Sequence, residues 1–296
     1  MATPAGANRS HELPAGSAIK LGPHQLWLRD SGPSALPVLV CLHGFPSSGA
    51  DFGRVWPLLA PHFRLLALDW LGLGQSDKPH PHDYRIADQA DLIDTLLKQL
   101  HITSCALLAH DYGDTVTQEL LARQQSAGRP YHIRAVVLLN GGLFPEAHRA
   151  RLVQRLLCRP LIGPILAQLI SASSYARSMR AIFGPATPPD TAFLNESWAA
   201  LHPRAARRVL PSLLGYLAER RLHRTRWLAA LTDASIPVRF IVGMADPISG
   251  AHMAARYEAL IPRADIVRLD RIGHYPQWEA PEAVVSAALP ILRPAA

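Results

Sequence analysis

A tight turn between a strand-like run and a helix-like run carries the strongest chemical signal in the sequence. The run that begins at Cys105 leads directly into Ala109-His-Asp111-Tyr-Gly113-Asp114, after which a helical pattern begins. A strand, a sharp turn and a helix, with small residues two positions before and after the centre, form a nucleophile elbow. Because Asp111 stands at the centre, the pattern predicts a carboxylate nucleophile. The simpler interpretation is that Asp111 only caps the helix.

Two further side chains follow later strand-like runs. Asp246 comes at the end of the run that begins at Pro237, and His274 follows the run that begins at Asp265. The chain order is therefore nucleophile, acid, histidine, and we predict Asp111, Asp246 and His274 as catalytic residues. Asp246 could instead cap a helix, and the alternative acids are Glu279 and Asp270.

Backbone donors for an oxyanion hole are predicted at two places. His43-Gly44-Phe45-Pro46 follows the first buried run, and the amides of Phe45 and Tyr112 are the expected donors. We expect His43 and Asp114 to hold their loops by hydrogen bonds. The glycines in Asp69-Trp-Leu-Gly-Leu-Gly-Gln-Ser76 lack the third glycine of a dinucleotide motif, so no cofactor is expected.

Short apolar runs bounded by turn residues must position these side chains. They span residues 37–43, 63–69, 105–110, 135–140, 237–243 and 265–270, and helical patterns such as 86–100 and 115–123 lie between them. Such runs are typical of strands buried on both faces of a parallel sheet. Their alternation with helices predicts a doubly wound α/β fold. Residues 25–29 are expected to add an antiparallel strand.

The interval from Leu143 to about Thr232 contains only helical stretches. An insertion of that length between two strands is expected to be a helical subdomain rather than a loop. We therefore predict an α/β core of residues 18–142 and 233–296, a helical cap of residues 143–232, and a disordered segment 1–17.

Composition excludes several classes of protein. The chain has 296 residues, of which 49% are hydrophobic and 18% charged, which is unlike a disordered chain. Its three cysteines form neither a disulfide framework nor a metal cluster, so a reducing, cytoplasmic location is expected. The first 17 residues lack the apolar core of a secretory signal, and no stretch is apolar enough to span a membrane.

Positive charge is concentrated in the predicted cap. The net charge is +7, and the interval from Leu143 to Trp227 holds 13 Arg against four acidic residues. One explanation is a general preference for Arg over Lys, combined with a solvated helix face. The other is weak contact of the Arg-rich cap with an anionic substrate or membrane surface. No nucleic-acid-reading motif accompanies the arginines, so nucleic acid is not an expected partner.

The motifs HGFP, DWLGLGQSDKP, HDYGD and GHYPQWEAPE resemble those of the epoxide hydrolase and haloalkane dehalogenase branch of the α/β-hydrolase superfamily. The segments HDYGDTVTQELLAR, LLNGGLFPEAHR, IFGP and RRLHRTRWLAAL are similar to the mesoderm-specific transcript proteins. The resemblance covers most of the chain from about residue 18. It implies a mostly parallel eight-stranded sheet flanked by helices, an inserted helical cap and a catalytic triad. Animal members of that family are associated with membranes, but this sequence shows no equivalent amino-terminal anchor.

A carboxylate nucleophile attacks sp³ carbon and forms an alkyl-enzyme ester, which a histidine-activated water then hydrolyses. The expected substrate is a small apolar epoxide or, alternatively, an alkyl halide. Dehalogenases of this branch carry Trp after the nucleophile, whereas Tyr112 stands here, which favours an epoxide. Epoxide hydrolases of the branch protonate the ring oxygen with two cap tyrosines, and the candidates are Tyr216 and, less favoured, Tyr175. Lipid ester hydrolysis or acyl transfer, and a non-catalytic binding protein, stay open as further alternatives, as does the oligomeric state.

Overall fold

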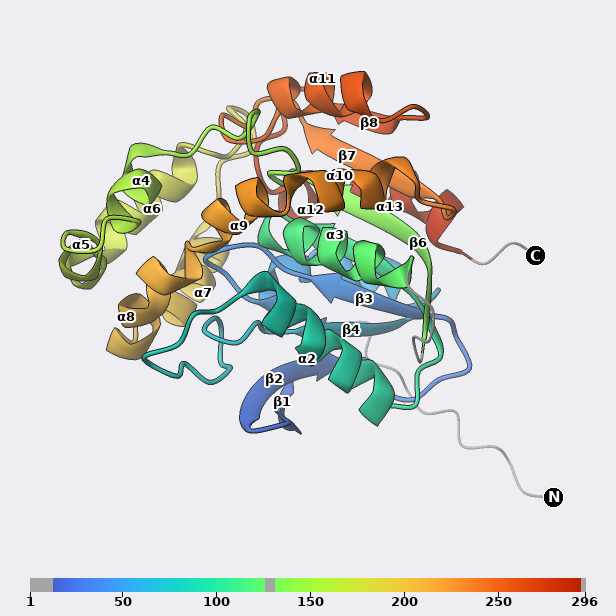
Figure 1. Cartoon of the computed structure of the whole chain (residues 1–296), viewed down its shortest axis with the longest axis horizontal. Helices are drawn as coiled ribbons and strands as arrows, with labels where there is room; N and C mark the ends of the chain where they lie inside the picture. Colours follow the sequence, from blue (N-terminus) through green and yellow to red (C-terminus); the bar gives the residue numbers. More distant parts are fainter. Residues whose placement is uncertain (1–12, 126–130, 294–296) are drawn as a thin grey trace.

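The computed structural model describes residues 13–125 and 131–293. In that part of the chain a single sheet has the strand order β1-β2-β4-β3-β5-β6-β7-β8 (Figure 1). The β1–β2 and β2–β4 pairs are antiparallel, and the other pairs are parallel. The predicted mostly parallel, eight-stranded sheet is therefore confirmed. The strands are Ser17–Leu21 (β1), His24–Asp30 (β2), Val38–Leu42 (β3), Arg64–Leu68 (β4), Ser104–His110 (β5), His132–Leu139 (β6), Val238–Gly243 (β7) and Asp265–Leu269 (β8).

The central strands are apolar throughout because helices cover both faces of the sheet. In β3, Leu39 and Cys41 belong to one hydrophobic cluster, whereas Val40 and Leu42 belong to the other. Side chains alternate between the two faces of a strand, so both sets must be apolar to be buried.

Helices form a layer on each side of the sheet (Figure 1). On one side lie α2 (Ile86–Gln99), α3 (Tyr112–Gln124), α10 (Arg224–Thr232) and α11 (Ala251–Leu260). On the other side lie η1 (Gly49–Phe52), α1 (Trp56–Leu59) and α13 (Pro281–Leu292). The short helix α12 (Pro276–Glu279) follows β8.

The structure describes the whole chain between β6 and β7, and seven helices lie in that interval. They are α4 (Leu152–Leu157), α5 (Gly163–Leu169), α6 (Ala172–Arg180), α7 (Thr191–Leu201), α8 (Arg204–Leu213), α9 (Tyr216–Leu222) and α10. Helices α4 to α8 project to one side of the sheet, whereas α10 lies along α3 (Figure 1). The indole N–H of Trp227 in α10 donates to the Glu119 carboxylate of α3 at 2.9 Å. We therefore place the end of the inserted layer before α10, rather than at residue 232.

The predicted disordered segment 1–17 needs correction at its end. Residues 1–12 lie outside the described part of the chain, but Ser17 already pairs with Leu28 in β1. The Trp27 indole also donates to the carbonyl oxygen of Ala15 at 3.0 Å. Five residues are too few to show a clear alternation in the sequence, so β1 was not predicted as a separate strand. None of the described helices has the length and apolar character needed to cross a bilayer.

Candidate active site

The structure brings Asp111, Asp246 and His274 together at the carboxyl ends of β5, β7 and β8. His274 Nδ1 lies 2.8 Å from Asp246 Oδ2, and His274 Nε2 lies 3.4 Å from Asp111 Oδ2. All three residues are buried. Parallel strands end at the same edge of a sheet, so residues far apart in the sequence form one carboxylate–imidazole–carboxylate chain.

Asp111 stands on a strained turn at the start of α3. Its φ of 49° and ψ of −101° lie outside the usual regions for a residue with a Cβ, at a cost of roughly 1–3 kcal/mol. Gly113 lets the turn pack against β3, because a Cβ there would lie 2.1 Å from the Leu42 carbonyl oxygen. The close approach of β3 therefore explains why a glycine stands two positions after Asp111.

Asp246 is held as a carboxylate by several donors. Its Oδ1 accepts from the Ile248 amide at 2.7 Å. Its Oδ2 accepts from Asn140 Nδ2 and from Ser249 Oγ, both at 2.9 Å. Burial alone would raise the pKa of Asp246, but the charge of His274 and these hydrogen bonds hold it below its ordinary value. Sequence reasoning missed Asn140 and Ser249, although Asn140 is a polar residue directly after β6 at the same sheet edge.

The surroundings of His274 favour its protonated form. Burial opposes the imidazolium, but the Asp246 and Asp111 carboxylates outweigh it and raise the pKa of His274 to about 10. Burial would likewise raise the pKa of Asp111, but His274 and the positive charge of Arg220 hold it below its ordinary value. The two carboxylates on either side of His274 thus favour its imidazolium form.

The predicted oxyanion-hole residues lie beside Asp111. The Phe45 amide donates to Asp111 Oδ1 at 3.3 Å. Tyr112 is the first residue of α3, where backbone N–H groups have no partner within the helix. His43 holds the Phe45 loop, since its Nε2 accepts from the Trp70 amide at 3.0 Å. One of the two predicted backbone donors, the Phe45 amide, thus contacts Asp111 Oδ1.

A cavity of about 310 Å³ opens from Asp111 and His274. Most of its wall is apolar and comes from the inserted helices, including Leu157, Leu166 and Met179. This lining suits an apolar substrate placed directly over the Asp111 carboxylate.

The two candidate tyrosines occupy different places. Tyr175 is part of the cavity wall. Tyr216 is not among the lining residues and packs against the elbow, with its ring centroid 5.0 Å from that of Tyr112 and 6.2 Å from that of Phe45. Tyr175 therefore lines the cavity, whereas burial and the charge of Asp111 raise the pKa of Tyr216, the tyrosine that the sequence favoured.

Arg220 of α9 reaches the back of the elbow and was not predicted. It is buried, its Nε donates to Thr115 Oγ1 at 2.8 Å, and its Nη2 donates to the Asp111 carbonyl oxygen at 3.5 Å. Arg220 belongs to the basic run Arg220-Arg-Leu-His-Arg224. No signal in that run separates a buried arginine from its solvent-exposed neighbours.

Glu279, an alternative acid in the sequence, holds the loop that carries His274. Its Oε2 accepts from the amides of Gly184 at 2.7 Å and Gly273 at 2.9 Å, and its Oε1 accepts from the Tyr275 amide at 3.0 Å. Gly184 belongs to the insertion, so this carboxylate ties the His274 loop to the inserted helices.

Comparison with known proteins identifies the family of the chain. The model of the alpha/beta hydrolase fold family matches residues 37–194. The mesoderm-specific transcript homolog protein of Bos taurus is 42% identical over 258 residues, which are 84% of this chain and 77% of the relative. LipZ of Mycobacterium tuberculosis is 38% identical over 262 residues, 88% of this chain and 90% of the relative. The crystal structure of haloalkane dehalogenase DbeA-M1 loop variant from Bradyrhizobium elkanii is similar with a TM-score of 0.75 and 25% identity, covering 92% of this chain and 95% of that one. The chain belongs to the α/β-hydrolase fold family and is a hydrolase of that fold.

Proposed function

We propose that this hydrolase opens epoxides to diols through an ester of Asp111. The observation that carries the proposal is the Asp111 carboxylate itself. It stands on the elbow, 3.4 Å from His274 Nε2, and opens into a largely apolar cavity. A serine hydrolase places a hydroxyl at this position, whereas a carboxylate there suits attack on sp³ carbon.

In the first step, Asp111 Oδ2 forms a bond to an epoxide carbon while the ring C–O bond breaks. The alkoxide takes a proton from the Tyr175 hydroxyl, whose pKa is raised by burial so that it holds its proton at neutral pH. Tyr175 is then reprotonated from the His274 imidazolium. Ester formation removes the charge of Asp111, one of the two carboxylates that raise the pKa of His274, so this transfer becomes easier.

In the second step, neutral His274 takes a proton from water and the hydroxide attacks the ester carbonyl. The oxyanion forms on Asp111 Oδ1, where the Phe45 amide already donates, and Asp246 supports the returning imidazolium. Collapse releases the product alkoxide, which takes the proton of the newly formed Asp111 carboxyl. The cycle ends with Asp111 ionised, His274 protonated and one water added to the epoxide.

The origin of the product oxygen tests this route. In a single turnover with enzyme in excess and in heavy-oxygen water, the label should enter the Asp111 carboxylate, because water attacks the enzyme ester. Peptide mass spectrometry locates the label. A first turnover that labels the diol and leaves Asp111 unlabelled would show direct attack of water on the substrate and would rule out the ester. An ester hydrolase in which Asp111 acts only as a base would likewise leave Asp111 unlabelled.

Hydrolytic dehalogenation is the second candidate, because the similar solved structure is that of a haloalkane dehalogenase. It would use the same ester but needs an N–H donor for the departing halide. No tryptophan is among the described residues that line the cavity, and the Trp70 indole N–H already donates to the His43 carbonyl oxygen at 2.8 Å. We therefore favour the epoxide. Halide release from a panel of alkyl halides, measured beside diol formation from epoxides, distinguishes the two.

The two candidate tyrosines, Tyr175 and Tyr216, provide a matched pair of variants. Tyr175→Phe should lower the rate of epoxide opening by roughly 10²–10⁴, the usual contribution of a positioned proton donor. Tyr216→Phe is the comparison, since Tyr216 is not among the residues that line the cavity, and we expect it to lower the rate less than Tyr175→Phe. Pre-steady-state kinetics of ester formation measures both. The reverse ranking would assign the proton to Tyr216.

A further inference from the structure

An exposed apolar surface lies on α5 and the turn before it. We call it the α5 patch. Large apolar side chains are ordinarily covered, and a group of them at the surface marks an interaction site. Leu161, Ile165 and Leu169 are spaced by four residues, so they follow one side of the helix. The members of the patch, with their exposed fractions, are Leu161 (86%), Ile162 (51%), Ile165 (66%) and Leu169 (71%).

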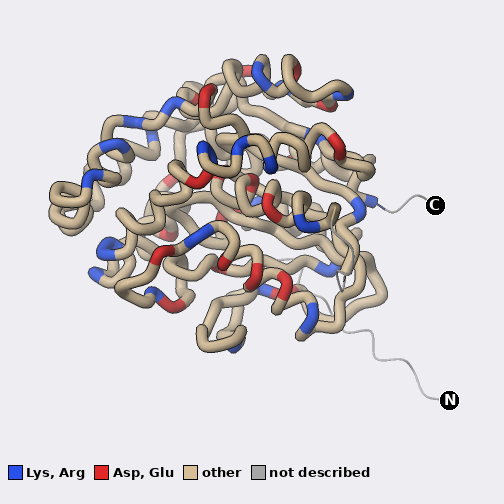
Figure 2. Tube along the Cα trace, in the orientation of Figure 1, with Lys and Arg blue, Asp and Glu red and all other residues tan. Residues whose placement is uncertain are grey.

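The segment that carries the patch is strongly basic. Residues 147–189 contain six arginines and no Asp or Glu, and Figure 2 shows blue without red on α4 and α6, on either side of the uncharged α5. None of these six arginines forms an ion pair with a carboxylate in the described chain. An apolar surface set in uncompensated positive charge is typical of a site for an anionic amphiphilic partner.

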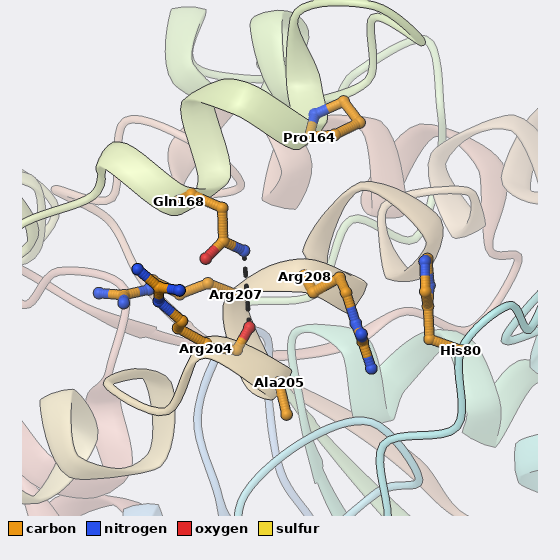
Figure 3. A pocket seen from close by; sticks show the side chains of 7 residues that line it. All are labelled: His80, Pro164, Gln168, Arg204, Ala205, Arg207 and Arg208. Carbon is orange, nitrogen blue, oxygen red and sulfur yellow. Dashed lines mark hydrogen bonds between the residues drawn. The ribbon is translucent and has the colours of Figure 1, made fainter.

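A second basic feature adjoins the patch. A surface pocket of about 730 Å³ lies between α5 and α8, and three arginines of α8 line it together with His80 and Gln168 (Figure 3). No acidic residue is among the described residues of this lining. Guanidinium groups bind phosphate oxygens in pairs of parallel hydrogen bonds. The three arginines are Arg204, Arg207 and Arg208.

We propose that the α5 patch and the arginine pocket beside it dock on a membrane surface that contains anionic phospholipid. The apolar side chains would enter the headgroup region, and the arginines would bind the lipid phosphates. Both features belong to the same helix, since α5 gives Pro164 and Gln168 to the pocket and also carries the patch. We propose anionic lipid rather than an apolar protein partner because the segment around the patch is positively charged.

The active-site cavity opens next to this surface. Leu166 and Leu169 of α5 line the cavity over Asp111, and Leu169 also belongs to the α5 patch. A substrate dissolved in the bilayer could pass along α5 without crossing water. This access route rests on the proposed function, whereas docking itself does not depend on any reaction.

Vesicle flotation tests the docking. The full chain should float with vesicles of phosphatidylcholine and phosphatidylglycerol, float much less with phosphatidylcholine alone, and be released by high salt because surface charges are screened. Leu161→Ser with Ile165→Ser should weaken binding at least about tenfold, given the apolar area removed. The control is Leu222→Ser, an equally exposed leucine on α9 (77%), which should bind like the wild type.

A second pair of variants tests the charge. Arg204→Gln with Arg208→Gln should lower binding to the anionic vesicles roughly 25-fold, at about fivefold for each arginine. Binding to phosphatidylcholine alone should not change. Arg263→Gln, an exposed arginine between α11 and β8, should have little effect. Thermal unfolding midpoints close to the wild-type value would show that the surface variants are folded.

Several outcomes would overturn the proposal. They are equal flotation with both lipid mixtures, wild-type binding in the Leu161 and Ile165 double variant, and no binding by the wild type. Stabilisation by inorganic phosphate without vesicle binding would show a small-anion site instead. Self-association that the double variant abolishes would show an interface between copies of the chain. Asp111→Ala should bind vesicles like the wild type, so a failed reaction and failed docking can be told apart.

Discussion

At the scale of single residues, the proposed mechanism separates attack from hydrolysis. Asp111 needs no base, because His274 and Arg220 already hold its pKa below the ordinary value. In that mechanism, His274 becomes a base only after the ester has formed and one of its two carboxylate neighbours has lost its charge. The proposal therefore assigns these two side chains, 3.4 Å apart, successive steps rather than the roles of a nucleophile and its activator.

Replacing the histidine should stop the reaction between these two steps. His274→Gln should react once and then retain the covalent ester, because no base activates the hydrolytic water. Intact-protein mass spectrometry should show the mass of the protein plus the whole epoxide. Asp111→Ala, treated in the same way, should show no adduct. If His274→Gln neither gains mass nor forms product from an epoxide that the wild type turns over, the ester mechanism does not operate here.

The sequence predicted that these three residues come together because the ends of buried strands can be located from their apolar runs. Asp111, Asp246 and His274 each follow an apolar run, and parallel strands bring such positions to one edge of a sheet. The cavity wall could not be predicted in the same way. Whether Tyr175 or Tyr216 faces Asp111 depends on how the inserted helices pack, and helical periodicity alone does not specify that packing.

At the scale of elements, two polar contacts join the insertion to the core. Arg220 of α9 reaches the elbow, and Glu279 after β8 accepts the Gly184 amide of the insertion. The strands themselves were predicted closely, but the end of the insertion was not. Helix α10 follows α9 without an apolar run between them, so only its contact with α3 shows which layer it joins.

The Glu279 contact can be tested by stability and by activity. Glu279→Ala leaves three backbone amides without their charged acceptor, and the free energy of unfolding should fall by about 3 kcal/mol. Glu279→Gln keeps one acceptor oxygen and should lose about 1 kcal/mol. Urea unfolding gives both values, and kcat should fall with them because His274 lies on the same loop. Glu258→Ala removes an exposed carboxylate paired with Arg268 and should cost less than about 1 kcal/mol. If Glu279→Ala and Glu258→Ala lower the free energy of unfolding equally, the hydrogen bonds of Glu279 do not stabilise the fold more than an exposed ion pair does.

At the scale of the whole molecule, the charge arrangement at the active site also affects folding. The unfolded chain has no carboxylates fixed beside His274, so its imidazole there titrates near the reference pKa of about 6.5. In the folded protein the Asp246 and Asp111 carboxylates raise that pKa to about 10. The folded state therefore binds one more proton than the unfolded state between these two values. The resulting stabilisation is fully present below pH of about 6.5 and is lost as the pH rises towards about 10.

This linkage predicts a difference in slope between two proteins. Between pH of about 7 and 9, the free energy of unfolding of the wild type should fall with rising pH more steeply than that of His274→Gln. The difference should be at most about 1.4 kcal/mol per pH unit, the limit for one proton. Thiols that titrate in the unfolded chain, such as the buried Cys41 whose pKa is raised by burial, contribute equally to both proteins and cancel. Urea unfolding at several pH values measures the two slopes. Parallel curves would mean that His274 is neutral in the folded protein, so that the resting site would hold no imidazolium and Tyr175 would have to be reprotonated by another group.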